Sequence, residues 1–131
     1  MQVLLPDGWA PPIGYANGIA VTPGRIVFIA GQVGWNAQQQ FDSDQIVPQF
    51  DQALRNLLAV LAKAGGGPQH IGRITAYCCD RAAYMGARRE LGAVWRQHMG
   101  THYPAMSMVF VSDLLDHPAC IELEATAVLS D

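Results

Sequence analysis

Hydrophobic residues recur with a helical period in one long stretch that begins near Val47. Apolar side chains repeat there at spacings of three, four and seven residues, the pattern of a helix with one buried stripe. That stripe consists of Phe50, Ala53, Leu54, Leu57, Leu58, Leu61 and Ala64. The polar run 42–44 supplies start signals, Pro48 is tolerated in a first turn, and the run 65–68, Gly-Gly-Gly-Pro, ends the helix. We therefore predict an amphipathic helix between these two signals.

A second helical pattern runs from Arg81 to Met99. Its apolar face would carry Tyr84, Ala87, Leu91, Val94, Trp95 and His98. Gly100 follows directly and is a typical helix terminator. The pattern predicts one continuous helix over these residues.

Runs rich in β-branched and apolar residues predict several strands. In the segment 18–35, two such runs flank Thr22-Pro23-Gly24, which predicts a hairpin. Its second run, 25–30, is apolar on both faces and is expected to be buried from both sides. Further strands are predicted at 71–80, 106–112 and 120–129, the last two joined by a turn at 116–118.

This order of elements predicts an α+β fold with two helices packed on one face of a mixed sheet. No predicted helix is left for the opposite face, so a partner subunit is the natural cover. With 131 residues, the chain is expected to form a single domain spanning 1–131. Its 50% hydrophobic and 15% charged residues also favour a surface that another subunit covers.

Charge excludes some partners. A net charge of −3 gives no basic patch for nucleic acid or for an anionic membrane surface. No apolar run approaches the roughly 20 residues of a membrane span. The odd number of cysteines, 3, and a start without a signal-peptide pattern favour the reduced cytoplasm.

Motifs for metals and cofactors are weak. His98 and His102 have the spacing of a ligand pair, but Gly100 between them would end the helix that must align them. Cys78 and Cys79 are neighbours on a strand and point to opposite faces. The glycine run follows a helix and lacks the lysine of a phosphate loop. We therefore expect no metal and no cofactor.

Chemistry could come from the last predicted strand, where Glu122 and Glu124 share one face because strand side chains alternate. That face is either a solvated sheet surface or a subunit junction, where a partly buried carboxylate can have a raised pKa and act as acid or base. Trp35 and Tyr15, which flank the predicted hairpin, could be packing residues or pocket walls.

Four motifs resemble the reactive-intermediate deaminase (Rid/YjgF) family in order and spacing, over nearly the whole chain. They are F-x-x-G-Q at 28–32, N-x-x-A-x-L-x-x-A-G at 56–65, P-x-x-S at 104–107 and E-x-E-A at 122–125. The resemblance implies a chorismate-mutase-like α+β protomer assembled as a homotrimer, with the sheets forming an inner barrel. Three pockets would lie at the subunit junctions.

The resemblance also implies an activity. The best-known members of the family hydrolyse 2-imino or enamine acids to 2-oxo acids and ammonia, without a cofactor. An arginine in P-x-R-S clamps the substrate carboxylate. A glutamate in the last strand positions the water or the leaving ammonia, helped by an N-terminal tyrosine and by a hydroxyl residue before G-Q.

Carried over to this sequence, the catalytic glutamate is Glu122 and the tyrosine is Tyr15. Gly31 matches as it stands, whereas Ala30 replaces the hydroxyl residue and Met106 replaces the arginine. The expected substrate site is lined by Tyr15, Ala30, Gly31, Trp35, Arg88, Met106, Ser107 and Met108.

The retained glutamate and the missing arginine predict hydrolysis of an enamine or imine that has no free carboxylate. A charge-assisted bond of the missing kind is worth about 1.5–3 kcal/mol. Three alternatives stay open. Arg88 or Arg89 could restore the anion site, the chain could be a non-catalytic trimer that binds a metabolite or protein partner, or it could be a ribonuclease, which the acidic composition opposes.

Overall fold

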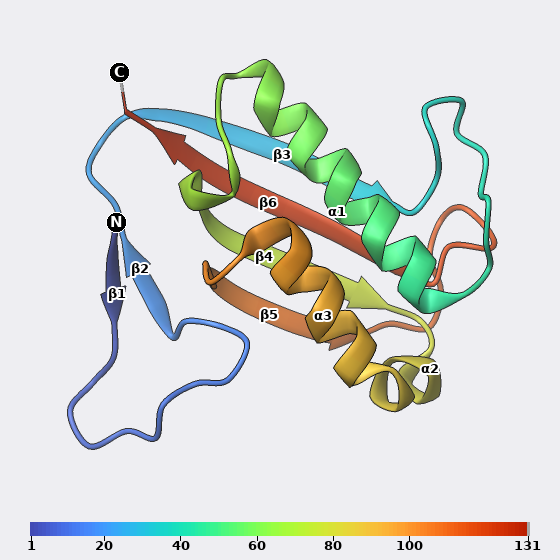
Figure 1. The fold of residues 1–131 in the computed structure, drawn as a ribbon, viewed down its shortest axis with the longest axis horizontal. Helices are drawn as coiled ribbons and strands as arrows, with labels where there is room; N and C mark the ends of the chain where they lie inside the picture. The colour runs from blue at the N-terminus through green and yellow to red at the C-terminus, as the bar shows by residue number, and fades with distance from the viewer. Residues whose placement is uncertain (131) are drawn as a thin grey trace.

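The structure is a computed structural model that describes residues 1–130 (Figure 1). Its elements follow in the order β1 (Gln2–Leu4), β2 (Gly18–Ala20), β3 (Arg25–Val33), α1 (Ile46–Lys63), a 3₁₀ turn (Pro68–His70), β4 (Ile71–Cys78), α2 (Arg81–Gly86), α3 (Arg88–Met99), β5 (Ala105–Phe110) and β6 (Ile121–Leu129).

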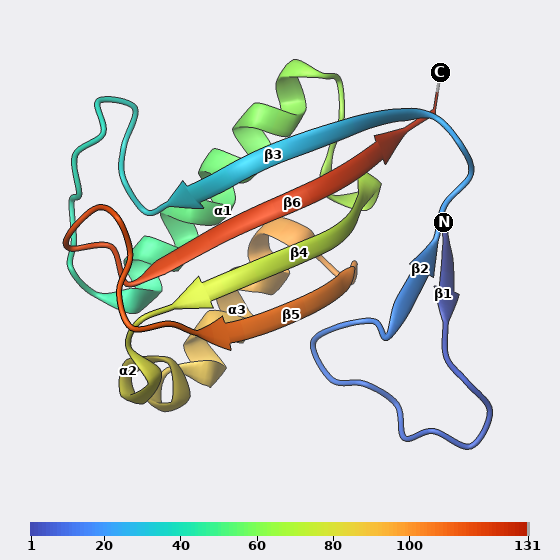
Figure 2. The same cartoon turned by 180° about the vertical axis from the view of Figure 1, so that it is seen from behind.

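The main sheet has the strand order β3-β6-β4-β5. Strand β6 enters last along the chain and pairs antiparallel with both β3 and β4, while β5 pairs parallel with β4. Helices α1 and α3 lie on one face of this sheet, and Figure 2 shows the other face without a helix. The predicted α+β arrangement, with helices on one face of a mixed sheet, is confirmed.

The core lies between the sheet and the two long helices. Strand β6 alternates strictly, and its inward residues are Ile121, Leu123, Ala125, Ala127 and Leu129. Helix α1 meets them with the predicted stripe, in which Ala53, Leu54, Leu57 and Leu61 are fully buried. Burial of this apolar surface is the main force that holds the layers together.

Helix α1 ends where the glycine run predicts. Gly65 has a φ of 85°, a conformation that glycine adopts without strain. The amides of Gly65 and Gly66 donate to the carbonyls of Ala62 and Leu61 at 3.0 and 3.1 Å. These two bonds form the Schellman motif, which satisfies carbonyls that the helix end leaves open.

The predicted hairpin around Thr22-Pro23-Gly24 is wrong. Strand β2 pairs with β1 in a separate two-stranded ribbon, whereas β3 pairs with β6. The turn signal lies between β2 and β3, where the chain changes direction. Strand β3 then pairs with the apolar strand β6 and not with β2. Gly24 permits this pairing, because a Cβ there would lie 2.1 Å from the carbonyl oxygen of Leu129.

The predicted helix from Arg81 to Met99 is divided into α2 and α3. The break falls at Ala87, whose φ of −117° is not helical, directly after Gly86. Glycine lowers helix stability, and Asp80 starts the first piece by accepting a hydrogen bond from the Ala83 amide at 2.9 Å. Gly100 ends α3 as predicted.

The open face of the sheet carries large apolar side chains. Phe28 is 79% exposed and Ile26 is 59% exposed, so β3 is not buried from both sides within one chain. None of the helices in residues 1–130 is both long and apolar enough to cross a membrane.

Candidate functional site

Glu122 and Glu124 lie on the open face of β6, the side away from the helices, as their alternation predicts. Both are partly buried there. Burial raises the pKa of Glu122, and the charges of Glu124 and Asp116 raise it further. A carboxyl group with a raised pKa holds a proton more readily than an ordinary one, which suits it to general acid–base chemistry.

Gly31 and Ala30 form a bulge of β3 beside these carboxylates. Ile29 pairs with Ala125 and Gln32 pairs with Leu123, so two residues of β3 face one residue of β6. A Cβ on Gly31 would lie 2.2 Å from Oε2 of Glu122. The structure therefore places Glu122 directly against the backbone of Gly31, and the two predicted site residues come together.

Asn56 holds this end of β3 in place. Its side-chain Nδ2 donates to the backbone carbonyls of Val33 at 2.9 Å and of Trp35 at 2.8 Å. Because Asn56 projects from α1, it ties the helix to the segment that follows the bulge. This contact gives a physical role to the asparagine of the second sequence motif.

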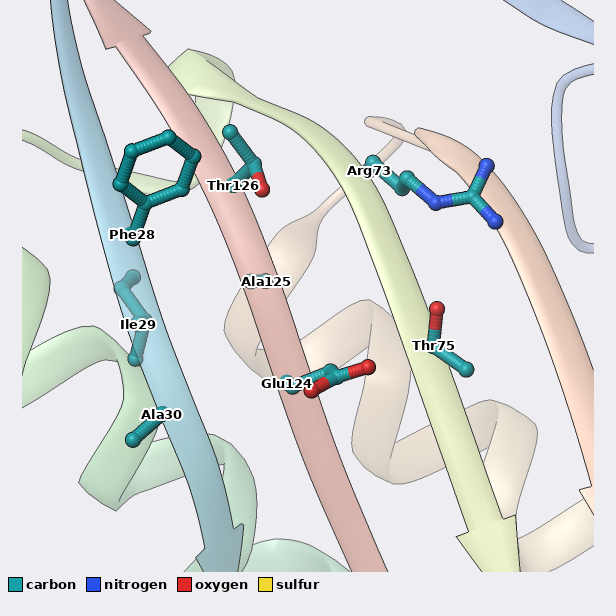
Figure 3. A pocket seen from close by; sticks show the side chains of 8 residues that line it. All are labelled: Phe28, Ile29, Ala30, Arg73, Thr75, Glu124, Ala125 and Thr126. Carbon is teal, nitrogen blue, oxygen red and sulfur yellow. The ribbon is translucent and has the colours of Figure 1, made fainter.

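A hollow of about 450 Å³ lies on the open face next to Glu124 (Figure 3). Its lining combines a guanidinium, a carboxylate, two hydroxyls and an aromatic ring. The lining residues are Phe28, Ile29, Ala30, Arg73, Thr75, Glu124, Ala125 and Thr126. Glu122 itself lies outside this lining, two residues before Glu124 on the same face of β6.

Tyr77 on β4 also reaches the carboxylates. Its hydroxyl donates to Oε1 of Glu124 at 2.6 Å. This hydrogen bond raises the pKa of Tyr77, with smaller contributions from burial and from the charges of Glu124 and Glu122. Tyr77 was not among the predicted site residues, although strand alternation puts it on the same face as Arg73 and Thr75.

Met106 and Met108 lie elsewhere. Both project from β5 and pack against the core beneath the helices, while Ser107 between them is exposed. Strand β4 separates β5 from β6. Within one chain, Met106 and Glu122 therefore occupy different strands and opposite faces of the sheet.

Tyr15 lies beside the start of β5 and not beside Glu122. The amide of the next residue, Ala16, donates to the carbonyl of Pro104 at 2.9 Å, and Ala16 pairs with Ala105. Tyr15 lines a smaller hollow of about 230 Å³ with Val3, Pro12, Ala16, Thr101, His102 and Tyr103. The predicted site thus divides into a group around Glu122 and a group around β5.

Two further predicted residues lie apart from both groups. Trp35 follows the end of β3, and its ring packs against Phe41 with centroids 5.7 Å apart. Arg88 is the first residue of α3 and is exposed, as is Arg89. Neither Trp35 nor Arg88 lines either hollow.

His98 and His102 each make a hydrogen bond within the protein, and the two do not share a site. His98 lies with Nε2 at 2.6 Å from Oδ1 of Asp51, and His102 lies with Nε2 at 2.7 Å from the carbonyl oxygen of Ile71. Among residues 1–130, no three histidine, cysteine or acidic side chains are grouped as metal ligands would be.

The fold is the one found in Rid and YjgF proteins. The solved structure of a Rid protein from Yersinia pestis, YyfB, described as a protein of unknown function, superimposes with a TM-score of 0.86 at 31% identity over 98% of each chain. Escherichia coli TdcF, solved with bound serine, gives a TM-score of 0.68 at 26% identity, covering 99% of this chain and 100% of the other.

Sequence comparison agrees with the structural comparison. Residues 9–129 match the protein family described as Endoribonuclease L-PSP. The RutC family protein PH0854 of Pyrococcus horikoshii is 30% identical over 128 residues, which cover 96% of each chain. The chain therefore belongs to the Endoribonuclease L-PSP family, in which the Rid and YjgF proteins fall.

Proposed function

We propose that this chain hydrolyses enamines or imines and releases ammonia, with Glu122 as the catalytic acid and base. The main support for this proposal is the position of Glu122. Its carboxylate lies against the Gly31 backbone, and its pKa is raised. A water molecule held there would add its oxygen to the C=N carbon while Glu122 takes one of its protons. Glu122 would return that proton to nitrogen to give a carbinolamine, and would then carry the hydroxyl proton of the carbinolamine to nitrogen as the C–N bond breaks, so that a carbonyl compound and ammonia leave.

The proposed substrate lacks a free carboxylate at the usual arginine position. Met106 stands where the family pattern has the clamp, and it packs against the core. The Escherichia coli relative TdcF binds serine, which carries a free carboxylate. An apolar thioether cannot repeat a charge-assisted contact with such a group, so cyclic enaminones, esters or thioesters fit better.

In this proposal the substrate site is complete only when a second copy of the chain is present. The Glu122 group and the β5 group do not meet within one protomer, and the open face leaves Phe28 and Ile26 exposed. A homotrimer, as the family resemblance implies, would cover that face and bring the two groups together across each junction. The three cysteines are free thiols, which fits a reduced cytoplasmic setting.

The alternative is a trimer that binds a metabolite but no longer catalyses. Two substitutions favour it, because Ala30 lacks the hydroxyl and Met106 lacks the charge that the family pattern contains. Ribonuclease activity fits this chain poorly, because a net charge of −3 and two carboxylates on the open face oppose binding of a phosphate backbone.

Ammonia release tests the proposal. Purified protein would be mixed with freshly generated 2-iminopropanoate and, separately, with its ester, and each rate would be compared with the uncatalysed rate. We expect acceleration with the ester that Glu122→Gln reduces by roughly a hundredfold or more. Strong acceleration with the free acid would show that another cation replaces the clamp, and loss of that activity in Arg88→Ala or Arg89→Ala would identify it.

The outcome also separates the two candidate functions. Absence of turnover across varied enamines, together with ligand binding that survives in Glu122→Gln, would support the non-catalytic trimer. Unchanged turnover of a true substrate in Glu122→Gln would refute the proposed mechanism.

A further inference from the structure

The two carboxylates on the open face of β6 have unequal surroundings. Glu124 accepts a hydrogen bond from the Tyr77 hydroxyl at 2.6 Å. Within residues 1–130, no hydrogen-bond donor reaches the side chain of Glu122. Tyr77 is the direct register partner of Glu122, so its ring lies opposite one carboxylate while its hydroxyl binds the other.

This asymmetry distinguishes the two carboxylates. The Tyr77 hydroxyl fixes the side chain of Glu124 on the open face. A negative charge held beside a carboxyl group favours the protonated form of that group, and the charge of Glu124 raises the pKa of Glu122 in this way. Glu122 is therefore the member of the pair that is suited to carry a proton.

We propose that Tyr77 and Glu124 are positioning residues that assign the exchangeable proton of this pair to Glu122. The inference deepens the proposed function, because it explains how one of two similar glutamates on one face becomes the acid and base. Tyr77 and Glu124 need not touch the substrate. They act through Glu122, which receives a proton from water and returns it to the leaving nitrogen.

The other charged groups near Glu122 are few. Strand β4 contributes Tyr77 and, farther along the same face, Arg73, whose charge lowers the pKa of Tyr77. The loop before β6 contributes Asp116, which raises the pKa of Glu122 as Glu124 does. Strand β3 faces Glu122 with Gly31 and Val33, which do not titrate. Of these two acidic residues, Glu124 has the larger effect on the pKa of Glu122, and its side chain is held by Tyr77.

The first test is the pH dependence of kcat/KM with the ester of 2-iminopropanoate as substrate. For a base that must be ionised, the acid limb reports the titration of Glu122. Glu124→Gln should move this limb to lower pH, because a repelling charge is removed. Tyr77→Phe should move it in the same direction by less, because Glu124 is then no longer held beside Glu122 by the hydroxyl.

Tyr84→Phe provides the matched control. Tyr84 packs edge-on against Phe110, with ring centroids 5.7 Å apart, away from the carboxylate pair. Its replacement should leave the acid limb unmoved. A structural effect of losing any tyrosine hydroxyl would change both variants alike, whereas the proposed role affects Tyr77→Phe alone.

The second test does not need activity. Carbon-13 NMR of labelled glutamate side chains would follow each carboxyl group as the pH is raised. The titration of Glu122 should move to lower pH in Glu124→Gln and, by less, in Tyr77→Phe. A Glu122 titration or an acid limb that is unmoved in Glu124→Gln would overturn the assignment. The expected movement of the Glu122 titration without any turnover would keep the proton assignment and refute the hydrolase proposal.

Discussion

The backbone of Gly31 lies directly beneath the carboxylate of Glu122, so close that a Cβ at Gly31 would come within 2.2 Å of Oε2. The contact joins the bulge of β3 to the open face of β6. Positive φ is not the reason for this glycine, because the positive-φ glycines are Gly8, Gly14, Gly65 and Gly100. Close approach is the reason, and the added atom would displace the proposed catalytic group.

Gly31→Ala should therefore damage activity much more than stability. The displaced atoms are the far end of a flexible side chain, which can rotate away at little cost in folding free energy. A displacement of about 1 Å at a catalytic group can cost roughly a hundredfold in rate. Steady-state kinetics and thermal unfolding of the same sample would check both expectations.

Gly86→Ala is the control for this substitution. Nothing lies within 4 Å of the Cβ that it would add, and Gly86 is at the end of α2. The activity of Gly86→Ala should match that of the wild type. Its stability should equal or slightly exceed the stability of the wild type, since alanine favours the helix. Equal activities in Gly31→Ala and wild type would show that the position of Glu122 is not important for turnover.

Much of this arrangement could be predicted from the sequence because it depends on periodicity. The strict alternation of β6 fixes the face of Glu122, and the stripe of α1 fixes which side of the sheet is the core. The family motifs predicted that Gly31 and Glu122 belong to one site, and the structure brings the two residues into contact. These features are local or repeat along one element, so a single sequence contains them.

Other features depend on which distant strands become neighbours. The Tyr77 contact with Glu124 joins residues 47 positions apart, and only the β4–β6 register brings them together. The hairpin prediction was wrong for the same reason, since a turn signal specifies a reversal and not the partner strand. The separation of Met106 from Glu122 likewise follows from β4 lying between β5 and β6.

Glu122→Gln should stabilise the fold slightly at neutral pH. The pKa of Glu122 is raised in the folded protein, so its ionised form is less favourable there than in the unfolded chain. Stability therefore falls as pH rises from the unfolded pKa through the folded pKa, and a neutral amide avoids that loss. The group is partly solvated, so an increase of roughly 1–3 °C in Tm at pH 7 is expected.

Thermal unfolding at two pH values would check this. The advantage of Glu122→Gln should disappear at a pH below the ordinary carboxyl value, 4.5, where both states of the wild type are protonated. A lower Tm than wild type at pH 7 would contradict the expected penalty.

Asp51 should contribute stability that is lost in acid. It joins the two long helices through His98, 2.6 Å away, and it also pairs with Arg55 one turn along α1. Burial alone would raise the pKa of Asp51, but the hydrogen bonds from His98 and Arg55 outweigh it and lower the pKa below its ordinary value of 3.8. A lowered pKa adds stability above the unfolded value, and this is lost as pH falls through the folded value.

Asp51→Asn should therefore cost about 1.5–3 kcal/mol at pH 7, the typical worth of a hydrogen bond to a charged group. Urea unfolding at pH 7 and at pH near 3 would measure it, and the difference from wild type should shrink in acid. Asp7→Asn, at an exposed position in the N-terminal segment, should change stability by less than about 0.5 kcal/mol at both pH values. A loss of stability in Asp51→Asn that is the same at both pH values would indicate lost packing and not lost charge.

Gln49 is the buried polar side chain on which the loop before β6 depends. Only 1% of it is exposed, yet its polar groups are satisfied. Nε2 donates to the carbonyls of Ser43 at 3.0 Å and Pro118 at 2.9 Å, and Oε1 accepts from the Cys120 amide at 2.8 Å. The side chain thus ties α1 to the start of the strand that carries Glu122.

Gln49→Leu should destabilise the protein by roughly 2–4 kcal/mol, because buried backbone groups would lose the hydrogen bonds that Gln49 makes to them. Gln97→Leu, at an exposed position of α3, should stay within about 0.5 kcal/mol of wild type. Denaturant unfolding would measure both. Since Pro118 and Cys120 precede Glu122 by a few residues, Gln49→Leu should also reduce turnover under conditions where it remains folded. Unchanged stability would show that these hydrogen bonds are replaced by water at no net cost.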